Sequence, residues 1–193
     1  MSGILHMGEH AYVVSTTTFD PYYSEFEDCL VWGLEVMCEH GALELRPSLN
    51  IDRLWTTSAG EPSDWTSAIG RIEKWDTRGQ SAEAPALLYL WEHLPIEWAN
   101  FEAAATNNRF ALRFSGSCDL SYEETLTRDT LVRATLQPTT WGIRVSTTDE
   151  AYARRVLGAF VDLNEFQPER GDEGLRFVSR SYGSPPQPAR RGT

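Results

Sequence analysis

Basic side chains are scarce in this sequence, and the first 45 residues contain none. Lys74 is the single lysine among 17 basic residues, and the formal net charge of the chain is −11. Residues 1–45 hold eight carboxylates, so this segment alone carries −8. A concentrated negative field repels nucleic acid and anionic lipid, and it speeds the encounter with a basic protein. We therefore expect a basic protein partner, and neither nucleic acid nor a membrane.

Cysteine is also rare, and long apolar runs are missing. Cys29, Cys38 and Cys118 are an odd number at irregular spacing, which favours buried thiols in a reducing compartment over a disulfide framework. No stretch approaches the roughly 18 apolar residues that cross a bilayer. The first residues lack the basic segment and apolar core of a signal peptide. These absences predict a soluble, cytoplasmic protein.

The short motifs of common catalytic and metal sites are absent as well. Lys74 stands in the sequence IEKWD, so a Walker-type phosphate loop has no lysine in the right context. Neither H-E-x-x-H nor paired C-x-x-C occurs, and residues 115–119 (SGSCD) differ from a nucleophile elbow. His6, Glu9 and His10 are explained more simply as a solvated terminus than as metal ligands. We therefore assign no catalytic residue, no metal and no cofactor.

Apolar and aromatic residues are plentiful. The 193 residues are 41% hydrophobic and include seven tryptophans, which is ample for one core. We expect a single domain over residues 1–182. Residues 183–193 (GSPPQPARRGT) have no apolar periodicity and are expected to form a disordered tail.

Helical and strand patterns both occur along the chain, which predicts an α+β domain. Its mostly antiparallel or mixed sheet would be covered mainly on one face by helices. Clean alternation of Phe110, Leu112 and Phe114 is typical of a half-buried strand. The expected strands are 11–19, 109–115, 141–146 and 175–182, with a possible short strand at 42–46; the last of the four could be an edge strand. The expected helices are 24–40, one from Asp64 to about residue 75, one from Pro95 to Asn107, and one from Asp149 to about residue 163.

The helix expected over residues 24–40 is the most informative of these elements. Ser24 and Glu27 match a capping box, and Gly41 suits the C-terminal cap. The alternative is a strand at residues 30–37, because Val31, Trp32 and Val36 favour sheets and Gly33 weakens a helix. We favour the helix, which places several carboxylates and Trp32 on one face.

A large aromatic side chain among carboxylates indicates a surface that something covers. Five of the tryptophans fall between residues 55 and 98, and most should lie in the core. Trp55 stands in a loop-like segment and is expected to be partly exposed. The predicted partner-binding residues are therefore Glu25, Asp28, Trp32, Glu35, Glu39 and Trp55.

In its general character the chain resembles the immunity proteins that neutralise bacterial toxins of the polymorphic or type VI secretion kind. The resemblance rests on the acidic segment 24–41, on LRPSLNIDRLW at residues 45–55 and on the terminal strand–helix–strand. It implies a stoichiometric inhibitor of a basic toxin, a nuclease being the commonest case. A small hydrolase or transferase with a dispersed carboxylate and histidine site is the alternative, and a structural or regulatory adaptor is the third.

Overall fold

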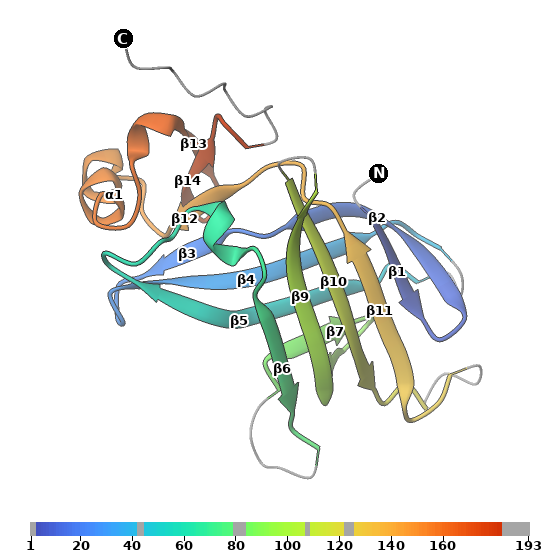
Figure 1. The fold of residues 1–193 in the computed structure, drawn as a ribbon. Coiled ribbons are helices and arrows are strands. Elements are labelled where there is room, and N and C mark those ends of the chain that lie inside the picture. Colours follow the sequence, from blue (N-terminus) through green and yellow to red (C-terminus); the bar gives the residue numbers. More distant parts are fainter. Residues whose placement is uncertain (1–2, 42–44, 79–83, 107–108, 122–125, 183–193) are drawn as a thin grey trace.

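The protein is mostly β-structure, so the predicted α+β fold class is wrong. The computed structural model describes residues 3–41, 45–78, 84–106, 109–121 and 126–182. Strand residues make up 56% and helical residues 9%, and no layer of helices covers the strands in the described part of the chain (Figure 1). The prediction failed because three segments with apolar residues at helical spacing are mostly strand.

The described strands form one continuous network of pairings. Their bounds are β1 (Gly3–Met7), β2 (His10–Thr18), β3 (Pro21–Ser24), β4 (Cys29–Cys38), β5 (Ser48–Ser58), β6 (Ile72–Asp76), β7 (Ala86–Tyr89), β8 (His93–Pro95), β9 (Trp98–Thr106), β10 (Arg109–Cys118), β11 (Thr130–Leu136), β12 (Gly142–Val145), β13 (Phe166–Gly171) and β14 (Gly174–Ser179). The helical elements are α1 (Glu150–Leu157) and two short 3-10 helices, η2 (Trp65–Ala68) and η3 (Leu163–Glu165).

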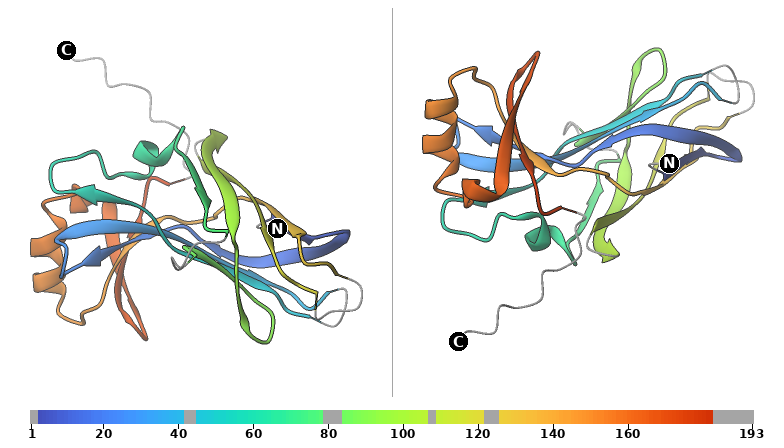
Figure 2. Two further views of the ribbon diagram at one scale, coloured as in Figure 1. Left: turned by 90° about the horizontal axis from the view of Figure 1, so that it is seen from below. Right: turned by 90° about the horizontal axis from the view of Figure 1, so that it is seen from above.

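The strands are arranged in two layers that cross at a steep angle, and β2 belongs to both (Figures 1 and 2). In one layer β6, β9, β10, β11 and β1 pair in that order, and the first half of β2 pairs with β1. The register shifts between Val14 and Thr16, and the second half of β2 then pairs with β4 in the other layer. A bulge of this kind bends a strand, so β2 can turn the corner between the two layers.

Strand β4 is the centre of the second layer. One edge of β4 pairs with β3 and β2, and the other pairs with β5, which continues to β7 and β8. Strand β3 also pairs in parallel with β12, which is followed by β14 and β13. At a bulge after Trp32, a Cβ added to Gly33 would lie 2.9 Å from the carbonyl oxygen of Ile51. Gly33, which would weaken a helix, is therefore required here, because any side chain would clash with the backbone of β5.

Aromatic rings fill the space between the layers. Phe19 contacts Trp32, Trp55, Phe101 and Phe110, with ring centroids 4.6 to 5.9 Å from its own. All five side chains are buried. Well-oriented ring pairs contribute about 0.5–1.5 kcal/mol each beyond the burial of their area. Much of the aromatic excess of the sequence therefore serves one core.

Residues 24–40 form a β-hairpin instead of the predicted helix. The backbone N–H of Glu27 donates to Ser24 Oγ at 3.4 Å, which is one of the two bonds of a capping box, but it lies in the turn between β3 and β4, and the Glu27 carboxylate pairs with Arg53. Pairing of β4 with strands on both edges buries Leu30, Trp32, Leu34, Val36 and Cys38. Strand pairing with distant segments overrides the helical spacing, and the alternative strand at 30–37 is confirmed.

Two other predicted helices are also mostly strand. Asp64 caps a helical turn as predicted, but this turn is η2, which ends at Ala68 and is followed by β6. Residues 98–106 form β9, between β6 and β10, where cross-strand hydrogen bonds replace the expected helix. The loop predicted after Trp55 begins later, because β5 continues to Ser58.

The terminal strand–helix–strand unit is closer to its prediction. Asp149 caps α1 by accepting the N–H groups of Ala151 and Tyr152. The helix ends at Leu157, earlier than predicted, and Phe160 is buried in the turn that follows. In the described residues, no helix is long and apolar enough to cross a membrane.

The other predicted elements have mixed outcomes. The strands expected at 11–19, 109–115 and 141–146 correspond to β2, β10 and β12 and are confirmed. Strand β14 lies between β12 and β13, so the expectation of an edge strand is wrong. Most of the expected strand at 42–46 and the whole expected tail at 183–193 lie outside the described residues.

Candidate functional site

The four predicted acidic residues are spread along β4 instead of sharing a helix face. Glu25 and Asp28 lie in the turn before β4, Glu35 lies within it, and Glu39 follows its end. Ten residues of strand span about 33 Å, so the two ends of this set are far apart. The single patch predicted from the sequence is therefore divided.

Glu25 and Asp28 have local partners. Tyr152 Oη of α1 donates to Glu25 at 2.6 Å, and Tyr23 Oη donates to Asp28 at 2.8 Å. The hydrogen bond to Asp28 raises the pKa of Tyr23 to about 12. Asp28 also adopts a positive φ of 49°, a conformation that aspartate tolerates in turns. Both carboxylates thus have a structural role at the α1 end of the molecule.

The two predicted tryptophans lie in the core, so their assignment to a partner surface is corrected. Trp32 is fully buried and Trp55 is 8% exposed. The two residues face each other across β4 and β5, their rings stack at 5.3 Å, and Trp32 Nε1 donates to Thr57 Oγ1 at 3.0 Å. Sequence reasoning placed Trp55 in a loop because it overlooked the length of β5.

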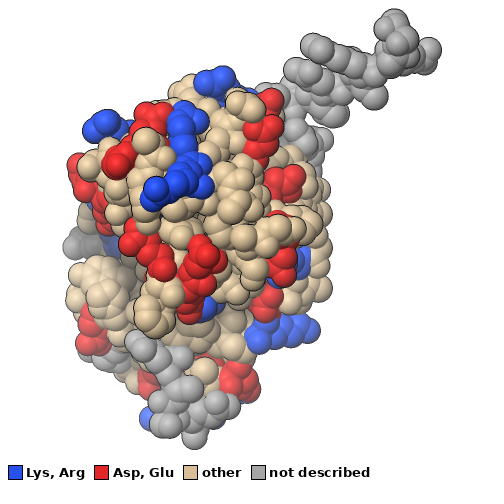
Figure 3. Space-filling model, turned by 90° about the vertical axis from the view of Figure 1, so that its left-hand side faces the viewer, with Lys and Arg blue, Asp and Glu red and all other residues tan. Residues whose placement is uncertain are grey.

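The negative charge that is concentrated in the sequence is dispersed in space. Asp20 is buried against Arg176, and Glu27 forms an ion pair with Arg53. Figure 3 shows acidic and basic side chains interspersed on the face at the α1 end. All four predicted carboxylates are exposed and outside the ion pairs of the described residues, and Glu35 and Glu39 differ from Glu25 and Asp28 in accepting no tyrosine hydrogen bond there.

Glu35 belongs to a face that sequence reasoning did not identify, the outer face of β4, β5, β7 and β8. Residues that pair directly across antiparallel strands present their side chains on the same face. Met37, Ser48, Tyr89 and His93 form one such row. Glu35 lies two residues before Met37 and therefore shares this face. We call this surface the β4–β8 face.

Large apolar side chains are exposed on and beside the β4–β8 face. Met37 is 38% exposed, Tyr89 is 41% exposed, and Trp91 in the β7–β8 turn is 52% exposed. The rings of Tyr89 and His93 lie 5.0 Å apart. Tyrosine, tryptophan and methionine are enriched where protein surfaces meet. The sequence signal for this face was the strand alternation around Leu88, because a buried Leu88 places the side chain of Tyr89 on the outer face. By itself, that apolar segment did not distinguish a strand from other structures.

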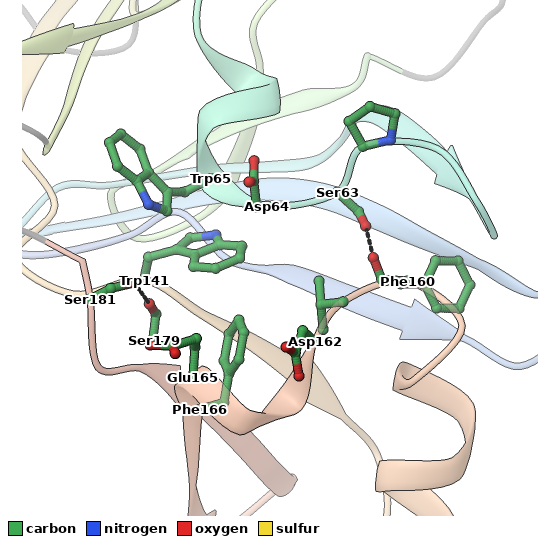
Figure 4. Close-up of a pocket in the computed structure, with 12 residues that line it drawn as sticks. Ser63, Asp64, Trp65, Trp141, Phe160, Asp162, Glu165, Phe166, Ser179 and Ser181 are labelled. Atoms are coloured by element: carbon green, nitrogen blue, oxygen red, sulfur yellow. Dashed lines mark hydrogen bonds between the residues drawn. The ribbon is translucent and has the colours of Figure 1, made fainter. Parts of the chain in front are cut away.

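A separate hollow of about 350 Å³ lies between η2 and the loop that carries η3 (Figure 4). Trp65 and Trp141 line it, and Ser63 Oγ donates to the carbonyl of Phe160 across its edge. Asp64 accepts the N–H of Ser67 at 3.1 Å, and Asp162 at its rim caps η3. Two carboxylates of this hollow, Asp64 and Asp162, therefore serve as N-terminal caps of η2 and η3. The hollow lies at the junction between these two helical elements.

The cysteines are not arranged as nucleophiles. All three thiols are buried, and burial raises the pKa of both Cys38 and Cys118 to about 12. A reactive cysteine needs a lowered pKa and access to solvent. In the part of the chain that the structure describes, no group of three or more histidine, cysteine or acidic side chains could hold a metal ion.

Comparisons with known proteins do not assign a function to this chain, so the function is argued from the geometry of the structure. No family model, no curated protein and no solved structure matches this chain.

Proposed function

We propose that this protein binds and inhibits a basic protein, as the immunity proteins that it resembles do with bacterial toxins. The contact surface is the β4–β8 face. The observation that carries the proposal is the exposure of Met37 and Tyr89 on the same face as Glu35, with exposed Trp91 in the adjoining β7–β8 turn. Aromatic and methionine side chains at the centre of an interface supply most of the binding free energy.

Carboxylates around the exposed apolar side chains give the face its preference for a basic partner. Glu35 lies within β4, Glu39 follows the end of that strand, and Glu92 stands next to Trp91 in the β7–β8 turn. Charges at the rim of an interface act mainly on the association rate, because they steer the approaching partner. The apolar side chains should act mainly on the dissociation rate.

The test begins with the whole chain as bait in extracts of the source cells. An inhibitor should retain one basic protein at equal stoichiometry and abolish its activity when the two are mixed. Recovery of no basic protein, or of one whose activity is unaffected by saturating amounts of this chain, contradicts the proposal.

Variants then locate the surface on the recovered partner. Glu35→Lys with Glu39→Lys should slow association most at low salt, where the Debye length is about 30 Å, and much less at 0.15 M, where it is about 8 Å. Tyr89→Ala with Trp91→Ala should accelerate dissociation at least about tenfold, which corresponds to 1.4 kcal/mol.

Two control variants match these changes elsewhere on the molecule. Glu9→Lys with Asp129→Lys makes the same change in net charge at exposed residues of turns next to β1 and β11. Ile72→Ala removes an apolar side chain that is 57% exposed on β6. Both should bind as the wild type does, and equal effects of test and control variants would refute the β4–β8 face.

A further inference from the structure

A polar groove runs along the outer side of β3, β12 and β14, away from the aromatic core. Two adjoining hollows of about 760 and 460 Å³ form it, and they share Glu35, Arg144 and Arg176. Tyr22, Arg144, Arg176 and Glu169 pair across β3, β12, β14 and β13, so their side chains form one row.

Two arginines stand directly opposite each other in this row, and within the described residues only Arg176 is seen to form side-chain hydrogen bonds and ion pairs. Its Nε donates to buried Asp20 at 2.6 Å, and its Nη2 donates to Thr140 Oγ1 at 3.0 Å. A second carboxylate, that of Glu169, lies 3.9 Å from Nη1. Like charges directly opposite on a sheet are destabilising, so Asp20 and Glu169 compensate one guanidinium of the pair.

Arg144 forms no ion pair among the described residues, and the only carboxylate whose charge is seen to act on it is that of buried Asp20, which is bonded to Arg176. Arg144 is half-buried, its Nε is inaccessible to solvent, and that atom has no hydrogen-bond partner among the described residues. Thr17, which is 8% exposed and lines the smaller hollow, likewise has a buried Oγ1 with no partner in the described part of the chain. Buried polar groups are normally hydrogen-bonded, so Nε of Arg144 lacks an acceptor and Oγ1 of Thr17 lacks a donor or an acceptor within the described residues.

Four carboxylates that line the groove restrict what the ligand of Arg144 can be. Glu35, Asp52, Asp172 and Glu173 line the same groove, and none of them forms an ion pair with Arg144 within the described residues. A dianion such as phosphate would be repelled by these four charges. A ligand with one carboxylate and one ammonium group avoids this repulsion, because each of its charges faces one of the opposite sign.

We propose that the groove binds a small zwitterion of the amino-acid or dipeptide class, with its carboxylate on Arg144 and its ammonium group towards Glu35 and Asp52. Guanidinium binds carboxylate through two parallel hydrogen bonds, which suits Arg144. Tyr22, which is 36% exposed, forms an aromatic wall beside the arginine. No protein partner is involved, so this inference does not depend on the proposed function.

The purified chain is titrated by calorimetry with glycylglycine and with L-amino acids that have uncharged side chains. Two blocked forms of each bound compound are then compared: the N-acetyl form lacks the ammonium group, and the amide lacks the carboxylate. Each blocked form should bind at least about tenfold more weakly than the zwitterion. Absence of binding by every zwitterion, or equal binding of either blocked form, overturns the proposal.

Variants assign the two ends of the ligand. Arg144→Gln should remove the preference for the free acid over the amide, and Glu35→Gln should reduce the preference for the free amine over the N-acetyl form. Arg133→Gln, at an exposed arginine of β11, is the matched control and should leave both preferences unchanged. Circular dichroism checks that each variant is folded. Unchanged selectivity in folded Arg144→Gln would also overturn the proposal.

Discussion

At the scale of single residues, the ion pair of buried Asp20 and partly exposed Arg176 joins two strand regions 156 residues apart in the chain. Asp20 is fully buried and accepts the N–H of Gly142 at 2.8 Å as well as Nε of Arg176. Burial raises the pKa of Asp20, and the bonds from Arg176 and Gly142 oppose this rise only in part. Desolvation therefore offsets much of the attraction, so the pair specifies the docking of β12 and β14 more than it stabilises the fold.

Removing one member of this pair should be costly. Asp20→Ala leaves Arg176 and the Gly142 N–H without their acceptor and should lower the free energy of unfolding by about 3 kcal/mol. Arg176→Met in the same chain should restore much of the loss, because the uncompensated charge is removed. Urea denaturation of the two single variants and the double variant measures the coupling. Additive losses would show that the two residues do not act as a pair.

At the scale of elements, β4 is the strand on which the second layer depends. It pairs along both edges, and Gly33 lies at its closest approach to β5. The nearest atoms to an added Cβ are backbone atoms of Ile51 and Asp52, which cannot rotate away as a side chain would. The stability of a variant with a side chain at position 33 therefore tests how closely β4 and β5 approach each other.

Gly33→Ala should accordingly destabilise the protein by about 1–3 kcal/mol, the usual cost of overpacking. Gly171→Ala is the matched control, because its nearest neighbour would lie 3.9 Å away and its change should stay within about 0.5 kcal/mol. Chemical denaturation of both variants measures the difference. Equal stability of the two variants would contradict the β4–β5 contact.

At the scale of the whole molecule, the core holds three groups that lose their protons at higher pH in the folded protein than in the unfolded chain. Burial raises the pKa of Cys38, Cys118 and Tyr182 to about 12 from ordinary values of 9.0 and 10.0. In the unfolded chain these groups ionise at the ordinary values. Their contribution to stability is therefore fully present below pH 9.0 and is lost as the pH rises towards 12.

The free energy of unfolding should consequently fall as the pH rises from 9.0 to about 12. Cys38→Ala with Cys118→Ala should be less stable at neutral pH but should show a shallower alkaline slope, since two of the titrating groups are gone. Urea melts at several pH values measure both slopes. Parallel curves for wild type and variant would show that the thiols do not contribute to the pH dependence.

The sequence by itself determined those features that depend on neighbouring residues. Alternation of Phe110, Leu112 and Phe114 was sufficient for β10, because side chains of a strand alternate between faces whatever it pairs with. Asp149 was sufficient for the start of α1, because its carboxylate accepts N–H groups two and three residues away. The scarcity of lysine and the acidic N-terminal segment likewise follow from composition alone.

Only the tertiary structure decided the features that depend on pairing partners far away in the chain. The spacing of residues 24–40 favoured a helix over the alternative strand at 30–37, and the strands β2, β3 and β5 on either side of β4 decide for the strand. The same pairing buries Trp32 and Trp55, divides the acidic segment, and brings Met37 and Tyr89 into one row. The sequence fixes the number of charges, but strand pairing decides on which surface each charge lies. A one-residue change of register would move every side chain of a strand to the opposite face of the sheet.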